Sequence, residues 1–473
     1  MAQAETVLSV HLSPEERAAK GKAARKVSPR ASHAAWSPEQ RTLQPLDLLA
    51  EQAVTRVPEL VPIRYGRMAA NAFSYYRGAA LPMAADLATV PRSGVRVQLC
   101  GDAHLANFGG FASPERDLVF DVNDFDETHP GPFEWDVKRL AASLEIAGRS
   151  RGFDASTNRT IVLEAVRTYR ETVRTFALQH QLDIWYAKLD VNGITALWGV
   201  DAGKAAVASL QRAAAKATSK DQLKAREKLT RDVDGQLQFL SDPPLLVPIE
   251  EVFSSPDEVD LIEGMVHGAL RSYRRTLSAD RRALLGNFRY VATARKVVGV
   301  GSVGTRCWVT LLVGRDNDDP LFLQFKEAEA SVLERFTVKS TCANHGQRVV
   351  EGQRVMQAAS DIFLGWQRVD APDREGTRDF YIRQLWDWKY SAPIDTMDPQ
   401  LLTVYAGMCA WTLARAHARS GDAIVLGSYL GSSPTFDRAI VEFARAYADQ
   451  NERDHQALLD SIKDGRVVAQ SGI

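Results

Sequence analysis

The segment GDAHLAN (residues 101–107), followed by FDVNDFD (residues 120–126), is the part of the sequence that decides the predicted fold. A strand-like run, VRVQLC (residues 95–100), leads into a turn that carries an aspartate and, five residues later, an asparagine. A second apolar run ends in two more carboxylates. One aspartate could face a hydroxyl group while the asparagine and another aspartate hold a hard cation, and phosphoryl transfer requires these parts.

The composition is that of an ordinary globular protein. The chain has 473 residues, which predicts two or three packed units, and 45% of its residues are hydrophobic and 25% charged. The formal net charge of -1 does not favour nucleic acid or a membrane surface as the main partner. No apolar run reaches the ~18 residues that a transmembrane helix needs, and the first residues lack the apolar core of a signal peptide. The four cysteines form no CxxC pair or Cys/His cluster, so we expect reduced thiols and a cytoplasmic protein.

The character of the sequence changes along the chain. Positions 17–30 hold six lysines and arginines and no acid, which predicts a solvated arm and leaves contact with phosphate or nucleic acid open. Near residue 290, apolar and β-branched runs such as CWVTLLV (307–313) replace helical patterns. The predicted units are a basic N-terminal arm (1–45), a large mainly helical lobe (46–289), a small β-rich lobe (290–395) and C-terminal helices that return to the large lobe (396–473).

Periodicity predicts individual elements within these units. Trp135, Leu140, Leu144 and Ala147 recur at helical spacing, which predicts a helix over 133–148. Residues 155–285 are mostly helical in pattern. Further helices are predicted at 345–358 and 435–462, and further strands at 361–369 and 379–388.

A glycine-rich motif, Gly299-x-Gly301-x-x-Gly304, opens the β-rich lobe. In a dinucleotide-binding unit a helix should follow such glycines, but the next run is the strand-like 307–313. A glycine-rich hairpin fits better, with backbone N–H groups around Ser302 able to close over phosphates. A hairpin that binds no ligand remains the alternative.

A lysine follows at the end of the strand-like run LFLQFK (321–326). Its ammonium group must be satisfied, and nucleotide phosphates would do this if Lys326 does not simply extend from an edge strand into solvent. Kinase-type sites pair such a lysine with a glutamate on the following helix. Glu351 is the first candidate, Glu334 and Glu329 are alternatives, and a surface role for each stays open.

The opening segment matches a catalytic-loop spacing. Asp102 and Asn107 stand five residues apart, as in the kinase loop H-R-D-x-x-x-x-N, and Asp124-Phe125-Asp126 takes the place of the metal-binding D-F-G. Aspartate and asparagine are common turn residues, so the pair alone is weak. The whole block, with a helix containing Asp136 after it, is more specific.

The same residues carry a resemblance to known families. Gly101–Asn107 resembles the H-G-D-x-H-x-x-N loop of aminoglycoside and choline phosphotransferases, and Asn123–Glu127 and Trp135–Ala141 resemble the segments that follow it there. Over nearly its whole length the chain also resembles the bacterial family catalogued as domain of unknown function 2252. That second resemblance is carried by Val61–Met68, Tyr76–Gly78, Gly101–Asn107 and Ala416–Asp422.

The resemblance to phosphotransferases implies an α+β, two-lobe, protein-kinase-like fold with a large helical lobe and a small antiparallel-sheet lobe. It implies that Asp102 accepts the proton of an acceptor hydroxyl and that Asn107, Asp124 and Asp126 hold Mg²⁺. It also implies that Lys326, Ser302 and the glycines contact the phosphates of ATP. The catalytic block precedes the glycine loop here, so the fold would be circularly permuted, which is tolerated when termini lie close together at a surface.

The roles of two further clusters of charged residues remain open. His417, Arg419 and Asp422 lie where an unpermuted chain would have its catalytic loop, but residue 427, five after Asp422, is glycine and not asparagine. These three residues could support a loop or a phosphate instead. A second cluster, Arg64, Arg67 and Arg77, could line an anionic pocket or extend from an aromatic-rich helix.

The function expected from the sequence is ATP-dependent, Mg²⁺-assisted transfer of a phosphoryl group to an unidentified hydroxyl on a small molecule or protein. The alternatives are a nucleotide-binding pseudokinase, an AMP-transferring enzyme on the same fold, and a non-catalytic helical binding or scaffold protein. Neither a membrane nor nucleic acid is expected as a partner.

Overall fold

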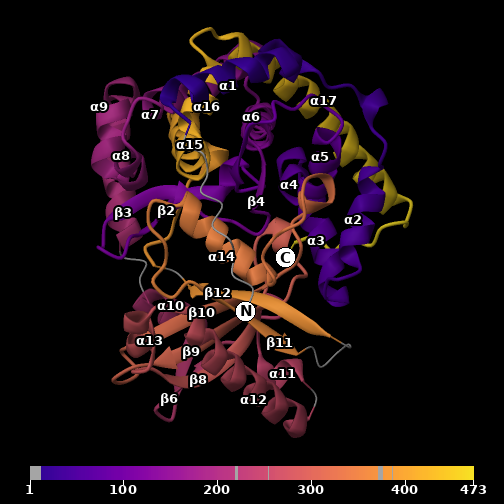
Figure 1. Ribbon diagram of the computed structural model, residues 1–473. Helices are drawn as coiled ribbons and strands as arrows, with labels where there is room; N and C mark the ends of the chain where they lie inside the picture. Colours follow the sequence, from indigo (N-terminus) through magenta and orange to yellow (C-terminus); the bar gives the residue numbers. More distant parts are fainter. Residues whose placement is uncertain (1–11, 219–221, 254, 371–375, 386, 473) are drawn as a thin grey trace.

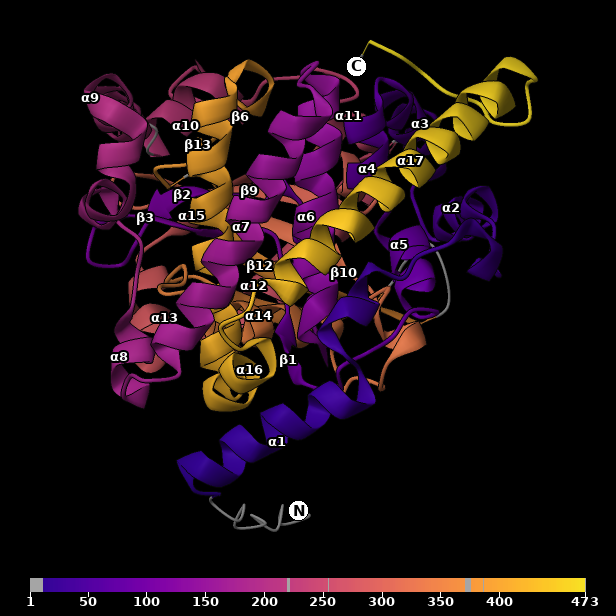
Figure 2. The ribbon, with the colours of Figure 1, turned by 90° about the horizontal axis from the view of Figure 1, so that it is seen from above.

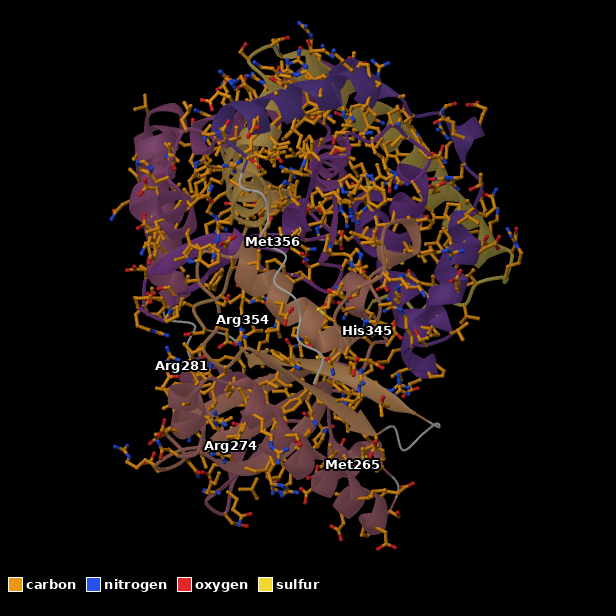
Figure 3. The ribbon with its side chains drawn as sticks, in the orientation of Figure 1. Met265, Arg274, Arg281, His345, Arg354 and Met356 are labelled. Atoms are coloured by element: carbon orange, nitrogen blue, oxygen red, sulfur yellow. The ribbon has the colours of Figure 1, made fainter. Side chains whose placement is uncertain are left out.

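A six-stranded antiparallel sheet lies at one end of the molecule, a set of helices forms the other, and helix α14 (His345–Met356) lies between them (Figure 1). The computed structural model describes residues 12–218, 222–253, 255–370, 376–385 and 387–472. The expected mixed α+β architecture with antiparallel sheets is confirmed. Figure 3 shows His345 and Met356 near opposite ends of α14, on the side of the sheet that faces the helices.

The sheet is built mainly from consecutive strands of one segment. Its strand order is β11 (Gly365–Asp370), β12 (Thr377–Gln384), β10 (Pro320–Ala328), β9 (Cys307–Val313), β8 (Arg289–Lys296) and β7 (Leu246–Pro248). The strands predicted at 361–369 and 379–388 are present with shifted ends. Strand β10 is central, and its register sets Lys326 opposite Cys307 on one side and Tyr381 on the other.

All nine residues of β10 are buried because both faces of the sheet are covered. Successive side chains of a strand point to opposite faces. Leu323 and Phe325 pack with helix α12 (Pro256–Tyr273), whereas Phe322 packs on the other face with Leu229 of helix α10 (Gln222–Leu229). Lys326 lies four positions after Phe322, so its side chain points to the same face of the sheet. This face is turned toward the helical end of the molecule.

Helix α6 (Phe133–Ser150) is the centre of the helical part, and its residues 133–148 are all buried. It is surrounded by α7 (Ala155–Phe176), α15 (Pro399–Ser420) and α17 (Thr435–Lys463). Figure 2 shows α17 crossing over α6 and continuing to α3 (Val61–Ala69). The helices predicted at 133–148, 345–358 and 435–462 are confirmed.

Short strand pairs position the two loops from which the fold was predicted. Strand β1 (Arg96–Leu99) pairs with β4 (His129–Pro132), and β2 (Phe108–Ala112) pairs with β3 (Leu118–Val122) and β13 (Tyr390–Ser391). The loop at 100–107 connects β1 to β2, and the loop at 123–128 connects β3 to β4. Both loops therefore emerge next to each other.

Helix α1 (Pro14–Val27) differs from the solvated arm that the basic residues suggested. It packs against α16 (Ala423–Leu430), and the Arg25 Nε–H donates to the Tyr429 carbonyl at 2.8 Å. Gly21 is needed there because a Cβ would lie 2.2 Å from the Val425 carbonyl oxygen. Residues 1–11 of the expected arm lie outside the described residues.

The stretch 155–285 contains strands as well as helices. Strands β5 (Thr230–Val233) and β6 (Gln236–Phe239) form a hairpin around Asp234 and Gly235, which both have positive φ. The sheet-containing end of the molecule thus begins well before residue 290, since β7 belongs to the sheet and α10 and α12 pack on it. The remaining helices are α2 (Pro45–Ala53), α4 (Ala72–Gly78), α5 (Ala80–Leu87), α8 (Gln181–Tyr186), α9 (Val191–Thr218), α11 (Ile249–Val252) and α13 (Ala279–Leu285). In the part of the chain that the structure describes, none of the helices is both long and apolar enough to cross a membrane.

Candidate functional site

A pocket of about 770 Å³ lies where the sheet meets the helical part. Its walls come from the two loops, the glycine-rich segment, the end of β10, helices α2–α5 and residues 389–395. The pocket brings together most of the residues expected at the site, which are Asp102, Asn107, Asp124, Asp126, Gly299, Gly301, Ser302 and Lys326. Gly304 and Glu351 are not among the described residues that line it.

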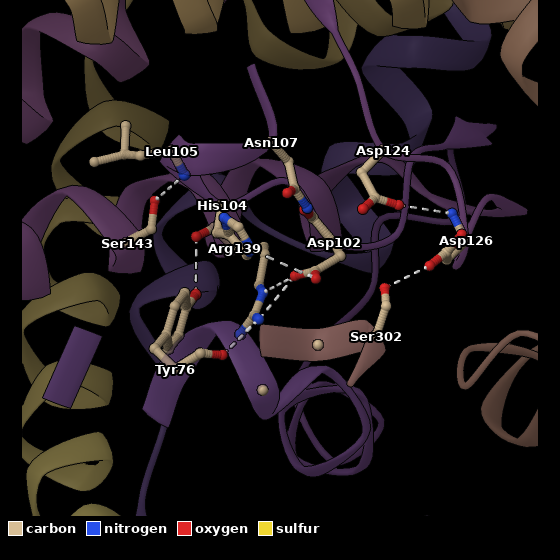
Figure 4. A network of polar contacts seen from close by, with 12 residues as sticks. Tyr76, Asp102, His104, Leu105, Asn107, Asp124, Asp126, Arg139, Ser143 and Ser302 are labelled. Carbon is tan, nitrogen blue, oxygen red and sulfur yellow. Dashed lines mark hydrogen bonds and ion pairs between the residues drawn. The ribbon is translucent and has the colours of Figure 1, made fainter. Parts of the chain in front are cut away.

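One face of α6 holds the loop at 100–107 (Figure 4). The Asp136 carboxylate accepts from the backbone N–H of Cys100 at 2.8 Å and of Gly101 at 3.0 Å. The Ser143 hydroxyl accepts from the Leu105 N–H at 3.2 Å. Positions 136, 139 and 143 share a helix face because residues three or four apart are neighbours on a helix.

The Asp102 carboxylate is held by a buried arginine. Arg139, which is 3% exposed, donates from Nε to Asp102 Oδ1 at 2.8 Å and from Nη2 to the Tyr76 carbonyl at 2.7 Å. Its guanidinium also lies 3.8 Å from the centre of the Tyr76 ring. The His104 Nε2 is 3.6 Å from Asp102 Oδ2, but burial, together with Arg77 and Arg139, holds the pKa of His104 well below its usual range. A neutral histidine therefore leaves Arg139 as the positive partner of Asp102.

Asn107 is oriented by its own loop. Its side-chain Nδ2 donates to the Asp102 carbonyl at 2.8 Å, and its backbone carbonyl accepts from the Asn123 N–H at 2.8 Å. With the amide nitrogen engaged, Oδ1 is the side-chain atom that remains for a cation.

Asp126 is occupied by three protein donors. Its carboxylate accepts from the Tyr381 hydroxyl at 2.8 Å and the Ser302 hydroxyl at 3.0 Å, and it forms an ion pair with Lys326. Burial opposes the charged form, but Lys326 and Tyr381 bring the pKa of Asp126 below its usual range. Asp126 thus connects the glycine-rich segment, the sheet and the loop.

Asp124 is the more available of the two carboxylates. Its side chain is 34% exposed, its Oδ1 accepts from the Asp126 N–H at 3.1 Å, and its Oδ2 lies 3.8 Å from Lys326 Nζ. Burial and the neighbouring Asp126 raise the pKa of Asp124, against the effect of Lys326. Burial would lower the pKa of Lys326, but the two aspartates raise it above its usual value, so Lys326 is charged.

The glycine-rich segment connects β8 to β9, so the predicted hairpin is confirmed. Helices α3 and α4 and the turn between α2 and α3 hold it from outside. The Arg56 Nη2 donates to the Gly301 carbonyl at 3.0 Å, and the Val57 N–H donates to the Gly304 carbonyl at 2.7 Å. Gly304 has a φ of 91°, which explains the glycine without a ligand.

The structure does not bring the glutamates to Lys326. The Glu351 carboxylate accepts from the Gln347 side chain at 2.6 Å, and that of Glu334 accepts from the Ser340 N–H at 3.1 Å. Instead, Arg348 of α14 donates to the backbone carbonyls of Asp126 and Glu329, both at 2.8 Å. The helix after the lysine strand therefore contributes an arginine that holds the loop, and Lys326 takes its carboxylate partners from that loop.

The second histidine-containing segment supports the site without entering it. The His417 Nε2 lies 3.2 Å from Asp136 Oδ2, and its Nδ1 is 2.7 Å from the Tyr169 hydroxyl. Asp422 accepts from the backbone N–H of Val425 at the start of α16 and pairs with Arg17, so it lies at a helix end and not in the pocket.

The sequence analysis assigned no role to Arg139, which holds Asp102, and left open whether Arg77 lines an anionic pocket. Arg139 could have been found from its position three residues after Asp136, on the same helix face. Arg77 lines the pocket, but no local spacing relates it to the loop.

The pocket offers a small set of oxygen atoms that could bind a cation. The described residues contain no group of three or more histidine, cysteine, aspartate or glutamate side chains arranged to hold a metal ion. Asn107 Oδ1 and Asp124 nevertheless fit Mg²⁺, which typically binds one or two carboxylates together with waters and substrate phosphates.

The chain belongs to the family described as an uncharacterized protein conserved in bacteria (DUF2252), whose model matches residues 56–461. Searches of curated proteins and of solved structures found no match.

Proposed function

We propose that this protein is an ATP-dependent phosphotransferase that uses Mg²⁺ and transfers a phosphoryl group to a hydroxyl acceptor. The observation that carries the proposal is the contact of Lys326 with Asp126, next to Asp124, in a pocket that also contains Asp102, Asn107 and the glycine-rich segment. These are the residue types that position and neutralise a nucleotide phosphate during phosphoryl transfer.

Each residue has a role in the proposed reaction. Asp102, fixed by Arg139, would orient the acceptor hydroxyl and accept its proton. Asn107 Oδ1 and Asp124 would hold Mg²⁺, which supplies positive charge to the phosphate oxygens when bound. Lys326 would donate to the phosphates, and the segment 299–302 would cover them.

The strand order supports a permuted, protein-kinase-like fold. Counting from β8, the glycine-rich segment connects the first and second strands, Lys326 lies on the third, and a helix follows it. Protein kinases have a glycine-rich loop, a lysine on their third strand and a following helix in the same relation. In this chain the loop with Asp102 and Asn107 precedes those strands, which is the basis for proposing a circular permutation.

The ion pairs favour binding of an anionic ligand together with a cation. Lys326 is 3% exposed and contacts two carboxylates, so the protein alone has no excess positive charge at this point of the pocket. A cation on Asp124 would compensate its carboxylate, so that Lys326, still paired with Asp126, could also contact a phosphate. We therefore expect ATP to bind much more tightly with Mg²⁺ than without it.

Titration calorimetry of the full chain with ATP, with and without Mg²⁺, tests the proposal. We expect binding that requires Mg²⁺ and that is lost in Asp124→Ala. Absence of Mg·ATP binding to the wild type would reject the proposal and favour a scaffold protein. Mass spectrometry of the products then distinguishes transfer of phosphate, transfer of AMP, and binding without a product.

A further inference from the structure

The tripeptide Tyr76-Arg77-Gly78, at the end of α4, is fixed from both sides by buried arginines. The Arg139 Nη2 donates to the Tyr76 carbonyl at 2.7 Å, and the Arg64 Nη2 donates to the Gly78 carbonyl at 3.1 Å. Both arginines are nearly inaccessible, with 3% and 1% of their surface exposed. Holding two neighbouring carbonyl groups with buried charges determines the backbone position of the residue between them, Arg77.

Arg77 lies directly under the glycine-rich segment. Its backbone carbonyl oxygen is 3.2 Å from the position that a Cβ on Gly301 would take, and its Nη2 is 4.0 Å from the corresponding position on Gly299. A side chain at residue 301 would have to displace this backbone. The glycines thus allow the segment to pass close over Arg77.

The Arg77 guanidinium has charged neighbours but no bonded partner. Within the described residues it forms no hydrogen bond or ion pair, and its Nε is buried without an acceptor. Burial lowers the pKa of Arg77, against the carboxylates of Asp102, Asp395 and Asp124. A buried N–H group without an acceptor is costly, and Arg77 lines the pocket, so an anionic ligand bound there would supply the acceptor that the described residues do not.

We propose that Arg77 is a catalytic residue that contacts the phosphoryl group during its transfer, as an arginine finger supplied by the same chain. This inference rests on the proposed function. The position fits because Arg77 lines the same pocket as Asp102, where the acceptor hydroxyl would be, and Asp124, where Mg²⁺ would be. Its Nη2 lies 4.0 Å from the Cβ position of Gly299, where the nucleotide phosphates would be.

The reaction balances without a change in Arg77. The acceptor oxygen forms a bond to the γ-phosphorus, and the bond from that phosphorus to the β–γ bridging oxygen breaks with its electron pair going to ADP. The hydroxyl proton passes to Asp102. Arg77 donates hydrogen bonds to the equatorial oxygens, over which the charge of the transferring group is spread in the transition state. With water in the acceptor position, the same step is ATP hydrolysis.

The planar fork of arginine distinguishes this role from simple charge balance. Lysine would preserve the positive charge near Asp102 but not the two parallel N–H donors. Arg77→Lys therefore separates a residue that contacts the transferred group from one that only compensates the carboxylates, and the variant keeps a cation for folding.

The experiment compares binding of Mg·ADP alone with binding of Mg·ADP plus aluminium fluoride, which imitates the phosphoryl group in flight. The full-length wild type, Arg77→Lys, Arg77→Ala and the surface control Arg159→Ala are measured by calorimetry, with melting temperatures to verify folding. We expect aluminium fluoride to tighten binding to the wild type and the control but not to the Arg77 variants, whose affinity for Mg·ADP stays within about twofold. ATP hydrolysis, where measurable, should fall by about 10³-fold.

Each other outcome has a defined meaning. Tightening that persists in both Arg77 variants overturns the inference, and so does an equal loss of Mg·ADP affinity, because Arg77 would then bind the ground state. A wild type that binds Mg·ADP without tightening also overturns it and leaves the proposed function standing. A wild type that binds no nucleotide rejects the proposed function itself.

Discussion

Lys326 and Asp126 form an ion pair although 200 positions separate them in the chain. Lys326 comes from the central strand of the sheet, and Asp126 comes from a loop of the helical part. The Ser302 and Tyr381 hydroxyls donate to the same carboxylate. This point therefore joins the two ends of the molecule, and it lies in the pocket where the proposed reaction takes place.

Asp124 and Asp102 should have separable effects. Asp124→Ala removes the accessible carboxylate, so we expect calorimetry to detect no Mg²⁺-dependent ATP binding. Asp102→Asn keeps a side chain of the same shape, so nucleotide affinity should change little while turnover falls by about 10²–10⁴. The opposite pattern, with affinity lost in Asp102→Asn and kept in Asp124→Ala, would contradict the assigned roles.

Asp136 should be essential for the shape of the catalytic loop. Asp136→Ala leaves the backbone N–H groups of Cys100 and Gly101 without an acceptor, at about 1–3 kcal/mol each. Asp136→Asn keeps one acceptor oxygen, so we expect it to lose roughly half as much in urea denaturation. The exposed control Asp464→Ala should retain wild-type stability. Equal stability of Asp136→Ala and the wild type would show that the loop does not depend on α6.

Asp121 and Arg415 form a pair in which each side chain is only 1% exposed. Arg415→Met would leave the carboxylate buried without its charged partner, which typically costs about 3–5 kcal/mol. Adding Asp121→Asn should recover part of that loss, because the uncompensated charge is then removed. Urea denaturation of the two single variants and the double variant measures this coupling, and additive losses would argue against it.

The buried Lys138 side chain should make the stability of the folded protein depend on pH. It is 0% exposed, its Nζ has no hydrogen-bond partner among the described residues, and burial lowers its pKa to about 7. Lysine in the unfolded chain titrates near ~10.4, so between these values the unfolded state binds more protons and the free energy of unfolding increases with pH. The stability gained at high pH is therefore lost as the pH falls toward about 7, the pKa of Lys138 in the folded protein.

The isosteric variant Lys138→Met removes this titration. We expect it to be more stable than the wild type near pH 7, with the difference becoming smaller as the pH rises toward 10. Parallel urea denaturation across this range provides the measurement. A difference that does not change with pH would mean that Lys138 is charged in the folded protein as it is in the unfolded chain.

Local patterns predicted the elements better than they predicted the contacts between them. The helix at 133–148 and the hairpin around the glycine-rich segment followed from periodicity and from the strand-like run after the glycines. The hairpin at 230–239 was missed within a helical stretch, although Asp234-Gly235 is a strong turn signal whose residues both adopt the positive φ of such turns.

The composition of the site was only partly accessible from the sequence. The spacing of Asp102 and Asn107 is local, and the structure shows their loop closed by the Asn107 side chain. The partners of Lys326 are not local, and the expected Glu351 was replaced by Asp126 because the loop, and not α14, supplies the carboxylates. The position of Arg77 in the pocket depends on how α4 packs under the glycine-rich segment, and no spacing in the sequence predicts that contact.

A crystal structure of the full chain with Mg²⁺ and a non-hydrolysable ATP analogue would show directly whether the proposed site binds the nucleotide. We expect Mg²⁺ at about 2.0–2.1 Å from Asn107 Oδ1 and an Asp124 oxygen. Lys326 should contact the phosphates, and the γ-phosphate should lie between Arg77 and Asp102. An analogue that binds elsewhere, such as the neighbouring cavity lined by Gln353 and Asp361, or density for the analogue without contact to Lys326 and Asp124, would contradict this expectation.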